Sequence, residues 1–209
     1  MTYFRDIVAY RSPYEWGSIE KLSPGGVAIA GISMMKHRDS TWWSIHDSTT
    51  SQGPILQKQR LPGNRGYQAG IELSREEKAG HYSDISNGIL WALLHSMPEH
   101  VDAAVYTGES RRQYGAVNNI VSNYVHASER LSVEDYHWML LPDIVRKRNP
   151  DAKISFDLHT QYWSPRTYEY VAELPNHEGI QRLMRDTVEA LLSADSLVFQ
   201  TPLDAEKYI

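Results

Sequence analysis

The chain has 209 residues, of which 41% are hydrophobic and 22% charged; this argues against a disordered or fibrous protein and suffices for one hydrophobic core. It contains no cysteine, which excludes disulfide bonds, thiolate metal sites and cysteine nucleophiles. A formal charge of -5 without a block of like charges disfavours a dedicated nucleic-acid binder, and no apolar run is long enough to cross a membrane. We therefore expect a soluble, cytoplasmic α/β protein with no nucleic-acid or membrane partner.

The N-terminal part is predicted to combine strands with loops. Apolar runs at 6–10 and 41–46 predict two strands, and 47–66 is expected to be a loop or a hairpin. Gly25 and Gly26 precede an apolar segment, 27–36, that is long enough for a helix. A glycine pair at a helix start lets backbone N–H groups approach an anion, although a plain turn is the simpler interpretation.

From residue 67 onward, strand and helix signals alternate. Strands are expected at 67–73, 131–135, 153–158 and 196–200. Apolar residues at helical spacing predict helices at 85–97, 111–128, 138–148 and 180–192. Ser74 and Glu77 fit a capping box at the start of a helix. This alternation indicates βαβ units, and therefore one domain over 1–209 with a mainly parallel sheet flanked by helices.

Polar side chains follow the predicted strands, at the sheet edge where parallel sheets bind ligands. They are Arg11, His46 and Asp47, Asp135 to His137, and His159 and Thr160. Two chemistries fit this set. Asp135, His137 and His159 could ligate a metal ion that activates water for hydrolysis, although no HExxH-like motif is present. Equally, a cation, a carboxylate and a histidine could bind a phosphorylated sugar.

Several motifs occur in a characteristic order. They are Arg11 after the first strand, Gly25-Gly26, YSDISNGILW at 82–91, DYHWMLLP at 135–142, LH at 158–159 and FQT at 199–201. Together they resemble the trehalose-6-phosphate synthase family, glycosyltransferase family 20. The resemblance implies a Rossmann-like domain that is one half of a GT-B fold. It also implies retaining transfer of glucose from a nucleotide sugar, such as UDP-glucose, to glucose-6-phosphate, in trehalose biosynthesis and without a metal or other cofactor.

The resemblance also implies an acceptor-phosphate site made of Arg11, Tyr82 and Trp91. The chemistry agrees, because a dianionic phosphate suits an arginine fork together with neutral Tyr O–H and Trp N–H donors. Tyr82 and Trp91 are nine residues apart and would lie on opposite faces of a straight α-helix. We therefore expect Tyr82 to precede the helix that carries Trp91. The alternative for Trp91 is a packing role in the core.

By the same resemblance, Asp135 would contact the acceptor sugar and His159 would hold a hydroxyl of the donor sugar. Gly25 and Gly26 would approach the donor diphosphate, where N–H dipoles stabilise the leaving group. The nucleotide-sugar-binding C-terminal domain is expected to be absent from this chain. The 209 residues would then form the acceptor-side half, inactive alone unless a second domain or a homo-oligomer completes it.

Four departures from the family pattern leave the sugar open. Glu134 replaces a histidine, residues 161–163 read QYW instead of P-F-P, Asp157 interrupts an apolar strand, and WWSIHD at 42–47 lacks the second tryptophan of W-x-G-W. A relative with another acceptor, such as a glucosylglycerol-phosphate synthase or a pseudo-glycosyltransferase, would show such changes. A non-catalytic sugar-phosphate-binding module is the alternative from another functional class.

Overall fold

The protein is described by a computed structural model covering residues 6–14, 16, 35, 39–49, 55–61, 63 and 65–208. Within these residues one seven-stranded sheet has the order β3-β4-β2-β1-β5-β6-β7, and β3 is antiparallel to β4 while the other pairs are parallel. The strands are β1 (Asp6–Val8), β2 (Thr41–Thr49), β3 (Ile55–Arg60), β4 (Tyr67–Leu73), β5 (Arg130–Glu134), β6 (Lys153–Asp157) and β7 (Ser196–Val198).

Helices follow most of the parallel strands. They are α2 (Arg75–Lys78), the π-helix η1 (Ala79–Leu90), α3 (Trp91–Leu94), the 3₁₀-helix η2 (Pro98–His100), α4 (Gly108–Val125), the 3₁₀-helix η3 (Tyr136–Trp138), α5 (Leu141–Arg148), α6 (Pro165–Val171), α7 (His177–Leu191) and α8 (Pro202–Tyr208). Among the described residues, none of these helices is both long and apolar enough to cross a membrane.

The predicted α/β class with a mainly parallel sheet is confirmed. The segment 47–66 contains a hairpin strand, since β3 pairs antiparallel with β4. Ser74 caps α2 through the expected capping box, accepting from the N–H of Glu77. The short helices α6 and α8 were not predicted, although each has proline in its first turn, at Pro165 and Pro202. Apart from the buried Met35, the predicted helix at 27–36, with Gly25 and Gly26, lies outside the described residues.

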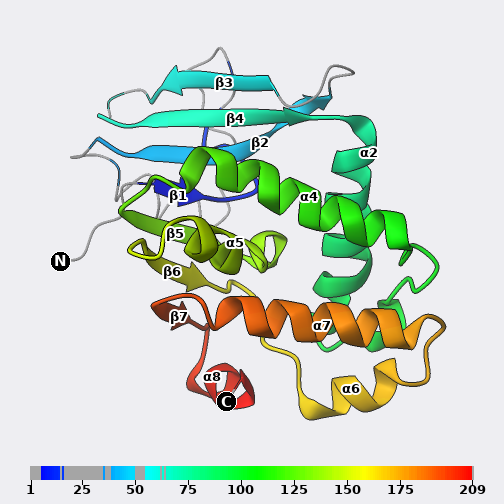
Figure 1. The fold of residues 1–209 in the computed structure, drawn as a ribbon. Helices are drawn as coiled ribbons and strands as arrows, with labels where there is room; N and C mark the ends of the chain where they lie inside the picture. Colours follow the sequence, from blue (N-terminus) through cyan, green and yellow to red (C-terminus); the bar gives the residue numbers. More distant parts are fainter. Residues whose placement is uncertain are drawn as a thin grey trace.

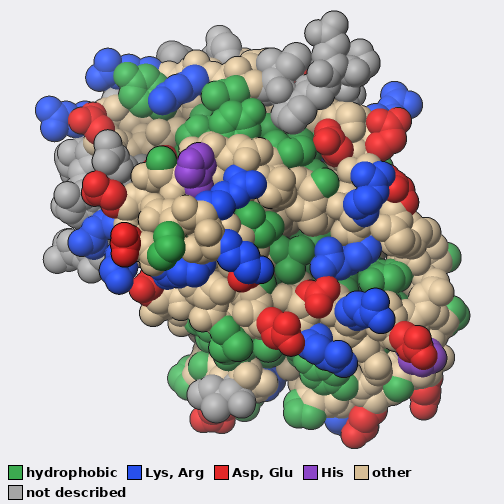
Figure 2. Space-filling view, viewed as in Figure 1, with side chains coloured by type: hydrophobic (Ala, Val, Ile, Leu, Met, Phe, Trp, Pro, Cys, Tyr) green, Lys and Arg blue, Asp and Glu red, His purple; other side chains and the backbone are tan. Residues whose placement is uncertain are grey.

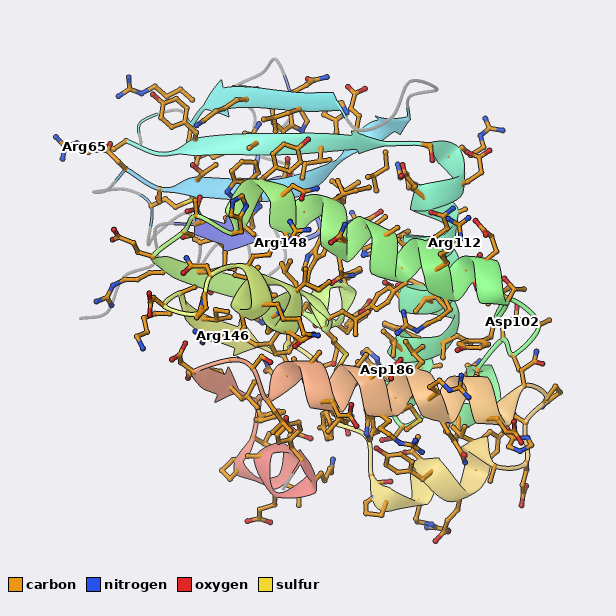
Figure 3. All side chains as sticks on the ribbon, viewed as in Figure 1. Arg65, Asp102, Arg112, Arg146, Arg148 and Asp186 are labelled. Carbon is orange, nitrogen blue, oxygen red and sulfur yellow. The ribbon has the colours of Figure 1, made fainter. Side chains whose placement is uncertain are left out.

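Three helices, α4, α5 and α7, cover one face of the sheet (Figure 1). Strand residues that point to this face, such as Leu131, Val133 and Phe156, belong to the main hydrophobic core. Figure 3 shows polar side chains on the helices that cover this face. Arg111 of α4 pairs with Asp186 of α7 at 2.7 Å, and Arg148 donates to Asn119 of α4 at 2.7 Å. On this same face, basic and acidic side chains are interspersed (Figure 2).

Candidate functional site at the carboxyl edge of the sheet

The strand order places a ligand site between β1 and β5. The chain runs from β1 to β2 on one side and reaches β5 on the other, so the topology reverses at this pair. Open α/β sheets bind ligands beyond the carboxyl ends of their strands at such a point. The segments that follow β1 and β5 carry Arg11 and Asp135, respectively, and α2 and η1 lie at the same edge (Figure 1).

A stack of aromatic rings joins the ends of β1 and β5 to η1. The ring of Tyr10 lies 4.3 Å from that of Tyr82 and 4.6 Å from that of His137, measured between centroids. Tyr136 stacks on the other side of His137 at 4.3 Å. Tyr10 therefore anchors Tyr82, and the residue that follows Tyr10 is the exposed Arg11.

Arg11 lies close enough to this stack to act on it electrostatically. Burial lowers the pKa of His137 well below its usual value, and electrostatic interactions with His81 and with the Arg11 cation lower it further. His137 is therefore neutral near pH 7. The carbonyl of Arg11 accepts a hydrogen bond from Trp42 Nε1 at 2.9 Å, which holds the backbone at this position.

The expectation that Tyr82 precedes the helix is wrong. Tyr82 lies in the first turn of η1, half-buried against Tyr10. Trp91 begins α3, is 36% exposed, and packs against His95 with tilted rings, 4.4 Å apart between ring centroids. Trp91 is therefore not a core residue, and among the described ring contacts it has no part in the stack around Tyr10. The wider turn of a π-helix, closed by i→i+5 bonds, is the physical reason that α-helical spacing misjudges this pair.

Asp135 has a strained backbone. Its φ of 77° and ψ of 171° fall in a region that is essentially restricted to glycine, at a cost of about 1–3 kcal/mol. Its N–H donates to the Asp157 carbonyl at 2.8 Å, and its own carbonyl accepts from Trp138 N–H at 3.1 Å. These bonds hold the strain in place. Burial raises the pKa of Asp135, although the backbone N–H of Tyr136 and the charge of His159 oppose that effect.

The structure brings Asp135 and His159 together, as the proposed sugar site requires. The His159 N–H lies 3.4 Å from Asp135 Oδ1. His159 Nε2 also donates to Glu134 Oε2 at 2.7 Å, a contact that the sequence did not indicate. This hydrogen bond raises the pKa of His159, although partial burial opposes the increase.

Glu134 and Asp157 are register partners on neighbouring strands, and each accepts from a serine hydroxyl. Ser132 donates to Glu134 Oε1 at 2.6 Å, and Ser155 donates to Asp157 Oδ2 at 3.1 Å. Burial raises the pKa of Asp157 to about 6, and the charge of Glu134 raises it as well. Since Leu131 and Val133 face the main core, these polar residues occupy the opposite face of the sheet.

The alternative metal site finds no support in the side-chain positions. No group of three or more histidine and acidic side chains in the described part of the chain is arranged to hold a metal ion. His137 packs inside the aromatic stack, whereas His159 bonds to Glu134. Asp135, His137 and His159 therefore do not form a ligand set.

Two of the departures from the family pattern have structural roles. Trp42 is buried, and Trp43 donates through Nε1 to Asp6 at 2.8 Å. Tyr162 and Trp163 are also buried, at 2% and 1% exposure. The other two departures touch the site: Glu134 accepts from His159, and the Asp157 carbonyl accepts from the N–H of Asp135. Gly25 and Gly26 lie outside the described residues.

Sequence reasoning missed Tyr10 and His81 as parts of the site. His81 is fully buried, and its Nε2 donates to the His137 carbonyl at 3.0 Å. Burial lowers the pKa of His81 to about 4, so it is neutral near pH 7. The position of Tyr10, directly before Arg11 at the end of β1, is a signal that could have identified it. His81 gave no such signal.

The chain was compared with known proteins and structures. Trehalose-6-phosphate synthase from Enterobacter sp. (strain 638) is 26% identical over 194 residues, which cover 91% of this chain and 38% of that protein. The UDP-forming α,α-trehalose-phosphate synthase A of Dictyostelium discoideum is 34% identical over 96 residues, or 44% of this chain and 13% of that protein. The chain thus spans less than half the length of these relatives.

Solved structures show the same fold. A UDP-forming α,α-trehalose-phosphate synthase from Burkholderia xenovorans, in complex with glucose-6-phosphate, aligns with a TM-score of 0.77 and 23% identity, over 97% of this chain and 41% of that one. A structure from E. coli bound with UDP-2-fluoro glucose aligns with a TM-score of 0.75 and 22% identity, over 97% of this chain and 41% of that one. The model of glycosyltransferase family 20 matches residues 9–209, and the chain therefore belongs to this family.

Proposed function

We propose that the chain is the acceptor-side half of a retaining glycosyltransferase. It would take part in transfer of a glucosyl or related unit from a nucleotide sugar, such as UDP-glucose, to a sugar phosphate such as glucose-6-phosphate. Family membership supports this reaction class. The observation that carries it is the contact between Asp135 and His159 at the carboxyl edge of the sheet, the edge at which Arg11 follows β1.

Each residue has a role that follows from its chemistry. The Arg11 guanidinium would form charge-assisted bonds to the acceptor phosphate, with Tyr82 O–H and Trp91 N–H as neutral donors. Asp135, ionised, would accept from a hydroxyl of the acceptor sugar. His159 would meet the donor sugar, and the N–H groups of Gly25 and Gly26 would stabilise charge on the departing diphosphate.

This distribution of roles needs no metal ion, because guanidinium and N–H groups supply the positive potential at the phosphates. The donor-nucleotide pocket is assigned to a second domain, which the relatives' greater length would accommodate. A homo-oligomer is the other way to complete the site. We also propose a cytoplasmic location and no nucleic-acid or membrane partner; the formal charge of -5 supports the lack of a nucleic-acid partner.

Binding of glucose-6-phosphate and of glucose to Arg11→Ala tests the proposal. A hydrogen bond to a charged group contributes about 1.5–3 kcal/mol, so the variant should bind glucose-6-phosphate about ten- to a hundred-fold more weakly. Binding of glucose should be unchanged, because the lost contact is to the phosphate. Arg11→Lys should recover only part of the loss, since an ammonium cannot make the planar two-point contact.

NMR titration suits the millimolar affinity expected for half a site. Arg112→Ala is a matched control, because Arg112 is exposed on α4 and pairs with Glu109. The proposal is wrong if Arg11→Ala weakens the binding of glucose-6-phosphate and of glucose equally, or weakens the binding of neither. If binding depends on the phosphate as expected, the affinities for glucose-6-phosphate, glycerol phosphate and cyclitol phosphates identify the preferred acceptor.

A further inference from the structure

Glu134 is a buried carboxylate for which the family motif supplies no role, since that motif has a histidine at this position. Its side chain is 8% exposed, and both of its oxygens are engaged. Oε1 accepts from the Ser132 hydroxyl at 2.6 Å, and Oε2 accepts from His159 Nε2 at 2.7 Å. A carboxylate with two such bonds has a fixed position, and it fixes the groups that donate to it.

His159 is bound by Glu134 on its buried side, and the rest of its side chain is partly exposed. Its side chain is 31% exposed, and Nε2 is committed to Glu134. Among the described residues, Nδ1 has no hydrogen-bond partner. A ligand at this edge of the sheet therefore meets the imidazole through Nδ1, the one ring nitrogen that is left to it.

We propose that Glu134 is a positioning residue, which binds Nε2 of His159 and so makes Nδ1 the atom that contacts the sugar. A histidine that is not held by a carboxylate can present either nitrogen, and the tautomer is set by whichever bond the other nitrogen makes. Glu134 requires the proton on Nε2. Nδ1 then accepts a hydrogen bond from a sugar hydroxyl when His159 is neutral, and donates one to a sugar oxygen when His159 is charged.

Among the described residues, the charged groups that act on the pKa of His159 are acidic. Glu134 on β5, Asp135 after it and Asp157 on β6 each favour the charged imidazole, and partial burial opposes them. The contribution of Glu134 comes first because it is the one carboxylate that receives a hydrogen bond from the ring. The inference rests on the proposed glycosyl transfer only for the identity of the ligand, since the Glu134–His159 contact exists without it.

NMR of the ¹⁵N-histidine-labelled chain reports both the tautomer and the titration of His159. The unmodified chain should show the proton on Nε2 at high pH. Glu134→Gln keeps the size of the side chain and removes its charge, so the pKa of His159 should fall by about one unit or more. Glu134→Asp, which keeps the charge on a shorter side chain, should retain part of the effect and also serves if Glu134→Gln fails to fold.

Asp157→Asn is the matched control, because it removes a neighbouring charge that receives no bond from His159. It should lower the pKa of His159 less than Glu134→Gln does. An unchanged titration and tautomer in Glu134→Gln and Glu134→Asp would overturn the proposal, as would an equal fall in Asp157→Asn. These measurements need no ligand, so they decide the role of Glu134 even if the proposed transferase function fails.

A second arm of the experiment adds UDP-glucose to the labelled chain. If UDP-glucose shifts the resonances of His159, the proposal requires Nδ1 to respond while Nε2 keeps its bond to Glu134, and a response mainly at Nε2 would contradict it. If glucose-6-phosphate leaves the spectrum unchanged up to millimolar concentration, the proposed acceptor site is at fault, and the titration remains the test of Glu134.

Discussion

Replacing Asp135 by glycine or by alanine measures the strain at the sheet edge. Both variants remove the same carboxylate, so their difference in stability isolates the backbone. A side chain at φ 77° and ψ 171° costs about 1–3 kcal/mol, whereas glycine costs about 0.5–1 kcal/mol more than alanine in lost backbone entropy. Asp135→Gly should therefore be more stable than Asp135→Ala by about 1 kcal/mol, the difference between the middle of the two ranges.

Urea unfolding gives this difference as a shift in midpoint at constant slope. Asp143, in the first turn of α5, is a matched control because a glycine there relieves no strain. Asp143→Gly should be less stable than Asp143→Ala by about 1 kcal/mol, the usual order in a helix. The reasoning is refuted if Asp135→Ala is as stable as Asp135→Gly. Both Asp135 variants should bind glucose-6-phosphate equally weakly, which separates the carboxylate's role from the backbone's.

Two further outcomes follow from the same residues. The contribution of His81 to folding stability should be complete above pH 6.5 and be lost towards pH 4, because unfolded His81 gains a proton in that window and folded His81 does not; its full size is about 3 kcal/mol. Asp157, with a folded-state pKa of about 6, contributes in the opposite direction between pH 4 and 6. His81→Phe should therefore lower the slope of stability against pH in urea unfolding, because phenylalanine does not titrate, and Asn118 still donates to the His137 carbonyl; an unaltered slope would contradict the burial argument. The 209-residue chain alone, given UDP-glucose and glucose-6-phosphate, should release no UDP above background, because the proposed donor pocket lies in the part of the relatives that this chain does not span. Steady turnover would show that a dimer completes the site or that the assignment is wrong.

Local patterns were sufficient to predict most of the sheet. The strands of the C-terminal part are short apolar runs between helices with a clear 3.6-residue period, and that alternation has few solutions other than βαβ units. Hairpin strand β3 was harder to predict from the sequence, because ILQKQR is mostly polar. Its pairing with β4 identifies it as a strand in the structure.

The π-helix was beyond what spacing could show. Apolar residues between 85 and 94 fit a 3.6-residue period, so an α-helix is the natural prediction. The packing of η1 on α4 imposes another constraint: at Gly80 an added Cβ would lie 2.6 Å from Gln113 Cβ, so the two helices approach closely there. Such a contact between segments about thirty residues apart leaves no local signature, and it decides where Tyr82 and Trp91 lie.

The site residues were predicted individually, and their contacts were not. Asp135 and His159 were selected because each follows a strand, and parallel strands end at one edge. The positive φ of Asp135 could not be predicted from the sequence, because glycine is the residue that usually adopts such a backbone conformation. The Glu134–His159 bond depends on the register of β5 against β6, in which Glu134 faces Asp157, and a shift of one residue would turn both side chains to the other face.

The replacement of the family's histidine by Glu134 argues for an altered site more than for a decayed one. A buried carboxylate without partners would cost several kcal/mol, and removing one partner of a buried pair is strongly destabilising. Here both oxygens of the carboxylate accept hydrogen bonds, one from Ser132 and the other from His159, so neither is left without a partner. The histidine that donates to Glu134, His159, is the one proposed to contact the donor sugar. The substitution therefore changes how that histidine is held without removing it, which directs the search for a specific ligand to Nδ1 of His159.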